Sequence, residues 1–281
     1  MSIGDKQIRL INSANNFLKD LKLSNIDLSL SSFCYFTTWS KTPGYVKLKY
    51  WLYGWSFALS YCTILFKNIL AIASHAKYIE IKKQNFFKKY DILVISWAFK
   101  KNFQADGSYH DRYFDENSKD LPNSHWILIS MDGYIPKNLN ENITLLKKKE
   151  GIFKYHFFSF IKILITTIFD CRFSPRKIYH YLFLPSYFAK IISRVVIKEI
   201  KKNACKAILL PYEGQPFQNN VFLNAKKFNK KIVTIGYLHS LLTPLPCQLI
   251  YRSGAPDLLL VHGESQIKIL QTILNKQLLK L

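Results

Sequence analysis

The fold of this chain is decided by three apolar runs near its C-terminus, AILLPYEGQP (207–216), KIVTIGYLH (231–239) and PDLLLVHGE (256–264). Each run ends in a small cluster of polar residues. Apolar residues at helical spacing, from Phe217 to Phe228, separate the first two runs. Short apolar strands that alternate with an amphipathic helix are typical of a parallel α/β sheet. The sequence therefore predicts three strands here and a helix that begins at Pro216, since proline suits the first helical turn.

The polar residues that end these strands indicate where a ligand would bind. In parallel α/β sheets, ligands bind outside the carboxyl ends of the strands. The residues at these ends are Glu213, Gly214, Gln215, His239, His262 and Gly263. The sequence therefore predicts a ligand site formed by these residues at one edge of the sheet.

Further elements upstream extend the predicted sheet. The run YDILVISWA (90–98) is typical of a buried strand, and 126–131 and 143–147 are shorter strands. Helices are predicted over 6–21 and over 151–202. The predicted fold class is α/β, with a Rossmann-like parallel sheet and additional long helices.

Two regions are predicted along the chain. Residues 1–89 form an N-terminal helical region that contains an apolar helix at 50–74. Residues 90–281 form a Rossmann-like α/β domain with a helical insertion at 151–202.

The apolar helix at 50–74 has three open interpretations. Its uninterrupted apolar stretch lies at the lower limit of the ~20 residues that span a bilayer, and Lys67 interrupts it. Aromatic residues crowd its N-terminal end, as at a membrane interface. A membrane span, an interfacial helix and a helix packed within the protein all remain open.

A second apolar stretch, 157–169, is flanked by the basic residues Lys154, Arg172, Arg176 and Lys177. An apolar helix of this length with basic flanks fits a membrane-surface helix better than a span. The alternative is a helix packed in the core.

The charge of the chain favours an anionic partner. The formal net charge is +22, with 40 Lys and Arg residues. Such a charge indicates an anionic membrane surface, a phosphorylated substrate or nucleic acid. Compositional bias is the other interpretation, because Lys, Ile and Asn are all abundant. Arg-rich, Gly-punctuated segments typical of nucleic-acid binding are absent, so we expect no nucleic-acid partner.

Cysteine usage and the N-terminus predict a cytoplasmic protein. The five cysteines are far apart and form no C-x-x-C pair, which is typical of reduced thiols. The first 20 residues contain no apolar core segment of a secretory signal.

Several motifs that carry chemistry are absent. Neither the dinucleotide-binding G-x-G-x-x-G nor the P-loop motif occurs. Zinc patterns and the serine-hydrolase motif G-x-S-x-G are also missing. No two acidic residues stand two positions apart, which argues against a nucleotide site that uses a metal held by Asp-x-Asp. We therefore expect no metal and no cofactor.

Candidate acid–base residues each have a catalytic and a structural interpretation. Glu213 is either a general base or an acid stabilised by a helix N-terminus. His239, which follows the flexible Gly236, either binds phosphate or donates a proton, or is an ordinary loop histidine. Asp111 and Arg112 are either a base with an anion clamp or an exposed ion pair.

The segment from Leu210 to Glu264 resembles bacterial surface-carbohydrate biosynthesis proteins of the GT-B glycosyltransferase type. In those sequences an acidic residue follows a buried strand, then comes a Gly-Tyr-x-His segment, then Pro-Asp, an apolar strand and Gly. The matching residues here are Pro211, Glu213, Gln215, Pro216, Gly236, Tyr237, His239, Pro256, Asp257 and Gly263. The loop DRYF (111–114) is also similar, and the likeness covers roughly residues 90–270.

The resemblance implies metal-independent transfer of a sugar from a nucleotide sugar to a membrane-associated glycan acceptor of capsule or lipopolysaccharide biosynthesis. From their positions at the strand ends and in the loop after the first strand, the candidate catalytic residues are Glu213, His239 and Asp111. The candidate substrate-binding residues are Arg112, Gln215, Tyr237, His262 and Gly263. Basic residues and apolar helices would hold the protein in the cytoplasm at the periphery of the anionic inner membrane.

The chain departs from this type in one respect. Only a short segment follows Gly263, whereas such enzymes usually hold the donor in a second domain. The sequence therefore predicts the N-terminal half of a GT-B architecture that lacks most of the donor domain. The alternative function is that of a non-catalytic partner subunit, from a truncated or split enzyme, that docks to a transferase or to the membrane surface.

Overall fold

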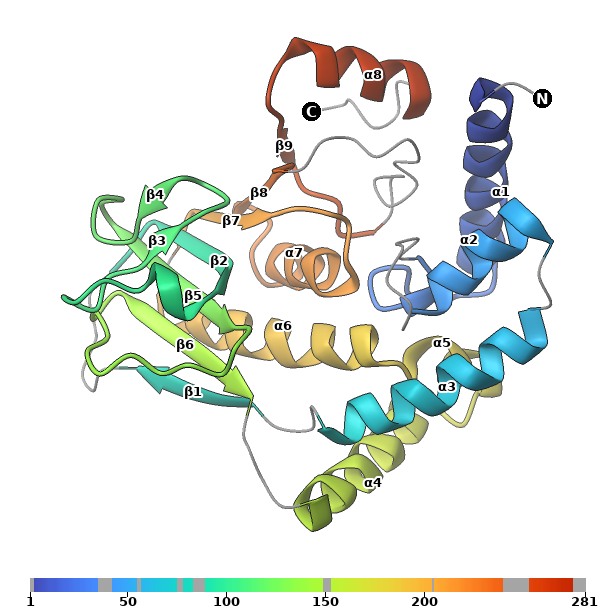
Figure 1. Ribbon diagram of the computed structural model, residues 1–281, viewed down its shortest axis with the longest axis horizontal. Coiled ribbons are helices and arrows are strands. Elements are labelled where there is room, and N and C mark those ends of the chain that lie inside the picture. Colours follow the sequence, from blue (N-terminus) through green and yellow to red (C-terminus); the bar gives the residue numbers. More distant parts are fainter. Residues whose placement is uncertain are drawn as a thin grey trace.

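The protein, described here by a computed structural model, contains a seven-stranded sheet on one side and a group of helices on the other (Figure 1). The structure describes residues 3–34, 42–54, 57–74, 78–82, 89–148, 153–203, 205–239 and 253–274. In spatial order the strands are β1 (Tyr78–Lys82), β6 (Ile143–Lys148), β5 (Ser124–Ser130), β2 (Ile92–Ala98), β7 (Ala207–Pro211), β8 (Val233–Tyr237) and β9 (Leu258–Leu260). Every strand predicted from the sequence is present.

The strand order is that of a doubly wound α/β sheet. From β6 to β9 all neighbouring strands are parallel, and only β1 pairs in the antiparallel direction, with β6. Strand β2 lies in the middle; β5 and β6 follow on one side, and β7, β8 and β9 on the other. The order thus reverses between β2 and β7, which is where such sheets bind ligands. The predicted α/β class with a Rossmann-like parallel sheet is confirmed.

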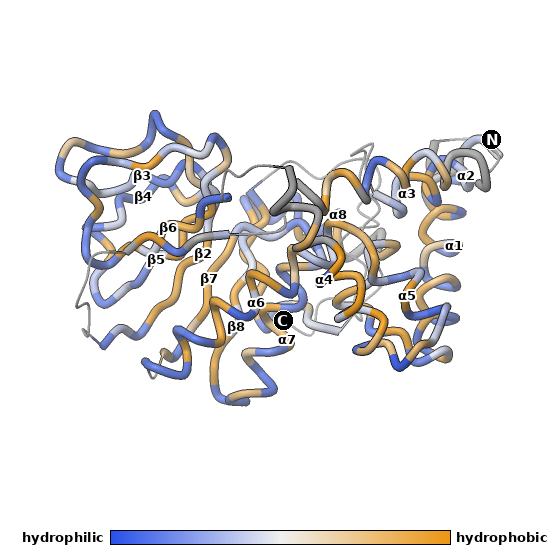
Figure 2. Tube along the Cα trace, turned by 90° about the horizontal axis from the view of Figure 1, so that it is seen from below, coloured by the Kyte–Doolittle hydropathy of each residue, from blue (hydrophilic) through white to orange (hydrophobic). Residues whose placement is uncertain are grey.

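The two faces of the sheet have separate cores because side chains alternate along each strand. Leu93 and Ile95 of β2 belong to the larger core, together with α6 (Leu184–Lys202) and α7 (Pro216–Phe228). Val94 of β2 belongs to the second core. The central strands are mostly hydrophobic, whereas the loops at the β3–β4 end are mostly hydrophilic (Figure 2).

Loops rather than helices cover the second face. No α-helix occurs in 99–123 or 131–142, both of which the structure describes throughout. A two-stranded hairpin, β3 (His110–Asp111) and β4 (Glu116–Asn117), lies in the first of these loops. The Tyr109 hydroxyl donates a hydrogen bond of 2.8 Å to the Trp97 carbonyl and ties the hairpin to β2.

The N-terminal region packs against the sheet and adds one strand to it. Helix α1 (Ile3–Leu23) places Leu10, Ala14 and Leu18 in the larger core. Strand β1, which the sequence did not predict, extends the sheet from within 1–89. The boundary at 89/90 between two regions stays a prediction.

The prediction of one apolar helix over 50–74 is wrong. The segment contains the end of α2 (Pro43–Tyr53) and the whole of α3 (Phe57–Ser74). Gly54 ends α2 because it adopts a left-handed conformation (φ 64°) and its N–H bonds to the Tyr50 carbonyl at 2.9 Å. Among the described helices, none is long and apolar enough to cross a membrane.

The predicted helical segment 151–202 contains three helices, α4 (Phe153–Asp170), α5 (Pro175–Tyr181) and α6. Helix α6 is the crossover that leads from β6 to the far side of β2, as the doubly wound order requires. An ion pair of 3.1 Å between Asp170 and Lys190 joins the end of α4 to α6. The last described helix, α8 (Glu264–Leu274), follows β9.

Candidate functional site

The turn after β7 holds Glu213 in a fixed position. Gly214 takes a left-handed conformation (φ 68°), and Gln215 then caps α7 ahead of Pro216. The side chain of Gln218 fixes this turn from within, since its oxygen accepts the N–H groups of Glu213 (2.9 Å) and Gln215 (2.8 Å). Its amide nitrogen donates to the Pro211 carbonyl at 2.6 Å.

Gln218 is a functional support that sequence reasoning missed. It is 1% exposed, so its hydrogen bonds are shielded from water. The sequence does contain a pattern that indicates this role. A Gln three residues after an N-cap residue can accept hydrogen bonds from N–H groups at the start of a helix. The apolar spacing of this stretch alone does not reveal it.

Glu213 and His239 come together at the carboxyl edge of the sheet. Oε1 of Glu213 lies 3.4 Å from Nε2 of His239, an ion-pair distance when the imidazole is protonated. Oε2 of Glu213 accepts a hydrogen bond of 2.8 Å from the side chain of Gln215. The Nδ1 atom of His239 is buried and has no hydrogen-bond partner among the described residues. The two residues that the sequence placed at neighbouring strand ends therefore form one pair.

Gly236 lets β8 approach the turn that carries Glu213. A Cβ atom on Gly236 would lie 2.8 Å from the Cβ of Tyr212, closer than packed carbons come. Tyr212 in turn bonds through its hydroxyl to Asn219 at 2.7 Å, and Asn219 donates to the Gly214 carbonyl at 3.1 Å. The glycine of the Gly-Tyr-x-His segment thus has a packing role.

Asp111 is buried beneath the hairpin that follows β2. Its side chain is fully buried, and Oδ1 accepts the N–H groups of Tyr113 (2.8 Å) and Phe114 (3.0 Å). Burial raises the pKa of this carboxyl, and the hydroxyl of Ser96 on β2 acts in the opposite direction. The Ser96 hydroxyl and Oδ2 of Asp111 are both buried, and neither has a hydrogen-bond partner in the described part of the chain.

Tyr113 connects this loop to the Glu213–His239 pair. Its ring meets the His239 ring edge-on, with ring centres 4.5 Å apart. The pKa of Tyr113 is raised by burial, then by the nearby carboxylates of Glu213 and Asp111. We call Asp111, Tyr113, Glu213, Gln215 and His239 the carboxyl-edge site.

Arg112 does not pair with Asp111, its predicted partner. It is exposed, and no ion pair joins it to Asp111 in the described structure. Because the Asp111 carboxylate turns inward to hold backbone N–H groups, the interpretation of Asp111 and Arg112 as an exposed ion pair is wrong.

The other predicted substrate-binding residues, Tyr237, His262 and Gly263, border the site on the β9 side. Tyr237 lies with its hydroxyl 3.5 Å from the ring of His262, and its own ring is 5.6 Å from that of Phe114. His262 is exposed and donates from Nε2 to the His239 carbonyl at 3.1 Å. Gly263 is exposed at the start of α8, where its carbonyl accepts the Gln266 N–H.

Asp257 of the Pro-Asp motif has a structural role. Its carboxylate accepts the N–H and hydroxyl of Thr234 at 2.9 and 3.0 Å and forms an ion pair with Lys226. These contacts tie the start of β9 to β8 and α7. Within the described residues, no group of His, Cys, Asp and Glu has the arrangement of a metal site.

The chemistry available at the carboxyl-edge site is proton transfer. An imidazole beside a carboxylate can take a proton from a hydroxyl, because the carboxylate stabilises the imidazolium that forms. The rings of Tyr113 and Tyr237 add flat surfaces on which a sugar or a base can stack. No protein family, characterised protein or solved structure gives a significant match to this chain.

Proposed function

We propose that this protein transfers a sugar, without a metal ion, from a nucleotide sugar to the hydroxyl of a membrane-associated surface glycan. The observation that carries the proposal is the Glu213–His239 pair, 3.4 Å apart, beside the place where the strand order reverses. Doubly wound sheets bind nucleotides at that place. The pair adds the base that a sugar acceptor needs.

In the proposed reaction, Nε2 of His239 removes the proton from the acceptor hydroxyl, since Nδ1 is buried. Glu213, whose Oε1 lies beside Nε2, stabilises the imidazolium that forms. The acceptor oxygen then attacks the anomeric carbon of the donor, and the bond from that carbon to the nucleotide phosphate breaks. Because Arg112 is exposed beside the site, it is free to contact the departing phosphate. The nucleotide leaves with the electron pair, so no metal is required for charge balance.

We propose that the enzyme is a glycosyltransferase of the GT-B type. The order of the motifs, from the loop with Asp111 to the turn at Gly263, supports that assignment. The Rossmann-like sheet is compatible with one half of such an enzyme. A non-catalytic partner subunit that docks to a transferase is the second candidate, and the binding experiment below separates the two.

The outer surface of α4 supports a place at the periphery of the cytoplasmic membrane. Phe158 and Phe169 are 62% and 63% exposed, and Ile165 lies between them on the same helix. Lys162 and Arg172 are exposed along the same segment. Exposed aromatic residues beside basic ones suit the boundary of an anionic bilayer, where rings insert and cations pair with headgroups.

The proposal predicts that one class of nucleotide sugar stabilises the folded protein. A ligand at about 100 times its dissociation constant adds about 2.7 kcal/mol of stability, which raises the melting temperature by a few degrees. A panel of uridine, guanosine, adenosine and cytidine nucleotide sugars, followed by thermal unfolding, identifies the class.

The Arg112→Gln protein is expected to bind that donor ~10-fold more weakly, because one charge-assisted contact to phosphate is lost. Arg9→Gln, at an exposed position on α1, is the matched control and is expected to bind normally. If no nucleotide or nucleotide sugar stabilises the well-folded protein, the transferase proposal fails and the partner-subunit alternative is favoured.

A further inference from the structure

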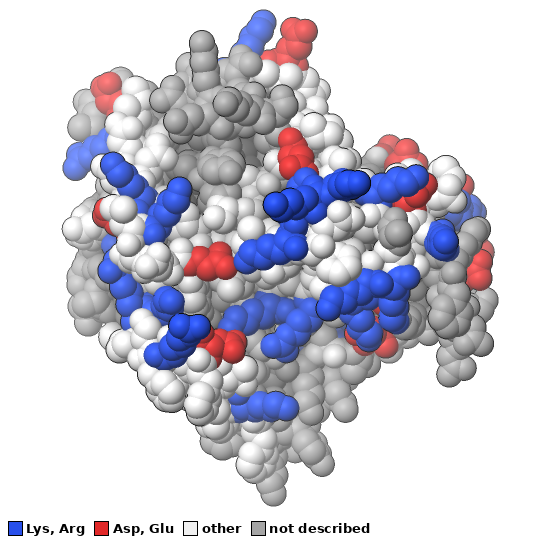
Figure 3. All heavy atoms as spheres, turned by 180° about the vertical axis from the view of Figure 1, so that it is seen from behind, with Lys and Arg blue, Asp and Glu red and all other residues white. Residues whose placement is uncertain are grey.

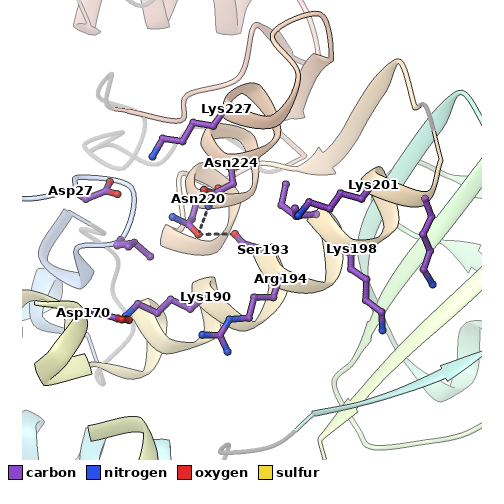
Figure 4. A pocket seen from close by; sticks show the side chains of 13 residues that line it. Asp27, Asp170, Lys190, Ser193, Arg194, Lys198, Lys201, Asn220, Asn224 and Lys227 are labelled. Atoms are coloured by element: carbon purple, nitrogen blue, oxygen red, sulfur yellow. Dashed lines mark hydrogen bonds and ion pairs between the residues drawn. The ribbon is translucent and has the colours of Figure 1, made fainter. Parts of the chain in front are cut away.

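A basic groove lies on the outer surface of α6 and α7, away from the carboxyl-edge site. It has a volume of about 860 Å³ (Figure 4). Its polar lining residues are Asp27, Asp170, Lys190, Ser193, Arg194, Lys198, Lys201, Lys202, Asn220, Asn224 and Lys227. Six of them are Lys or Arg and two are acidic. Lys and Arg side chains gather over this face of the molecule (Figure 3).

The basic lining follows from the spacing of residues on α6. Lys190, Arg194, Lys198 and Lys201 recur every three or four residues, so they lie along one side of the helix. The residues that α6 buries in the core, such as Ile192 and Val196, have the same period but a different phase. The cations of α6 therefore line the groove, and α7 adds Lys227 from the other side (Figure 4).

Three of the six cations have carboxylate partners. The pairs are Lys190 with Asp170 (3.1 Å), Lys198 with Glu80 (3.2 Å) and Lys202 with Glu199 (3.9 Å). In the part of the chain that the structure describes, Arg194, Lys201 and Lys227 form no ion pair, and all three are exposed. Three positive charges are thus left to meet a ligand.

Two buried polar residues of the groove lining, Ser193 and Asn220, are held in place by hydrogen bonds. Ser193 donates to the side chain of Asn220 at 2.6 Å, and Asn220 donates to the hydroxyl of Ser29 at 3.1 Å. All three residues are buried. Asn224 also donates to Asn220, at 3.0 Å (Figure 4). Because these side chains bond to one another, they join α6, α7 and the loop after α1.

We propose that this groove binds a ligand with two adjacent phosphate groups. Each phosphate monoester carries about −1.5 to −2 charge at neutral pH, so two phosphates match the charge of Arg194, Lys201 and Lys227. The guanidinium of Arg194 can hold two phosphate oxygens at once, and the lysines act as point charges beside it. The volume is that of a small-molecule site rather than of an extended interface.

The lining argues against nucleic acid as the ligand. Among the described residues that line the groove none is aromatic, so they offer no stacking surface for bases. Asp27 and Asp170 lie at the α1 and α4 side of the groove, where they would repel a continuous phosphate backbone (Figure 4). A short, doubly phosphorylated group avoids both problems.

The groove is independent of the proposed sugar transfer. Its cations lie on the outer surfaces of α6 and α7, whereas Glu213 and His239 lie in the turns at the ends of β7 and β8. Variants in the groove therefore leave the catalytic pair intact. Failure of one proposal is distinguishable from failure of the other.

The test is a calorimetric titration of the full chain with inorganic pyrophosphate at low salt. We expect saturable binding that weakens at least ~10-fold in the protein with Arg194→Gln and Lys201→Gln, because two charge-assisted contacts are lost. The matched control carries Lys230→Gln and Lys231→Gln, which remove the same charge from exposed positions outside the groove. Circular dichroism confirms that both variants fold.

Vesicles distinguish the source of the phosphates. If phosphatidylcholine vesicles that contain an isoprenyl diphosphate lipid bind the control but not the groove variant, the phosphates belong to lipid headgroups. If both variants stay bound to vesicles while only the groove variant loses pyrophosphate, the ligand is a soluble diphosphate. The proposal is overturned if wild type binds neither probe. It is equally overturned if both variants weaken alike, or if duplex DNA binds in a groove-dependent way and pyrophosphate does not compete.

Discussion

Sugar transfer by the His239→Gln protein is expected to be ~10²- to 10⁴-fold slower than by wild type, because the base that activates the acceptor is lost. Glutamine is close in size to histidine and does not accept a proton at neutral pH. The donor dissociation constant should change little, since in the proposed mechanism His239 acts on the acceptor. The measurement is kcat under saturating donor, together with donor affinity from thermal unfolding.

Glu213→Gln should also lower kcat. In wild type the carboxylate lies 3.4 Å from the imidazole, and an uncharged amide in its place no longer stabilises the imidazolium. Residues that act as one unit are not additive, so the double variant should be no slower than the slower single variant. Glu141→Gln, an exposed carboxylate before β6, is the control. Multiplicative losses in the double variant would contradict a catalytic pair.

The second large effect concerns stability in acid. His180 on α5 is 4% exposed, and its Nδ1 shares a hydrogen bond of 2.9 Å with the Ser31 hydroxyl. Burial lowers the pKa of His180 from 6.5 to about 4, and the positive charges of Arg176 and Lys47 act in the same direction.

The sign of the effect follows from proton binding in the two states. Between pH 6.5 and about pH 4 the unfolded chain protonates His180 and the folded chain does not. The free energy of unfolding therefore keeps its full His180 contribution above pH 6.5. It falls by about 3 kcal/mol in total as the pH drops towards 4. Acid should loosen the packing of α5 against the loop after α1.

Urea unfolding at pH 7 and at pH 4.5 checks this expectation. The His180→Gln protein cannot titrate at this position, so its stability should fall less over that range than the stability of wild type does. His110→Gln, at a half-exposed position in the β3–β4 hairpin, controls for removal of a histidine elsewhere. Parallel pH profiles for wild type and His180→Gln would show that His180 is not the cause.

Most of the sheet could be predicted because its strands are short, apolar and bounded by polar residues. Strand β1 could not, since Tyr78–Lys82 alternates apolar and charged residues and pairs only at an edge. The break at Gly54 was missed because hydropathy alone ignores helix ends. The spatial order of the strands depends on long-range pairing that local patterns do not contain.

The candidate site was only partly predictable. Glu213 and His239 are 26 positions apart in the sequence, and their meeting was expected because parallel strands end at one edge. The inward turn of Asp111 was not expected, because a loop sequence does not reveal which carboxylates hold backbone N–H groups. The basic groove was hidden within a chain that is lysine-rich throughout.

The most direct test of the central claim is transfer of radiolabelled sugar from the nucleotide sugars to a glycan acceptor in a membrane extract, measured with and without EDTA. We predict that the wild-type chain labels the acceptor at the same rate with and without EDTA, and that His239→Gln does not label it detectably. Absence of transfer from every donor, or equal transfer by His239→Gln, would contradict the account.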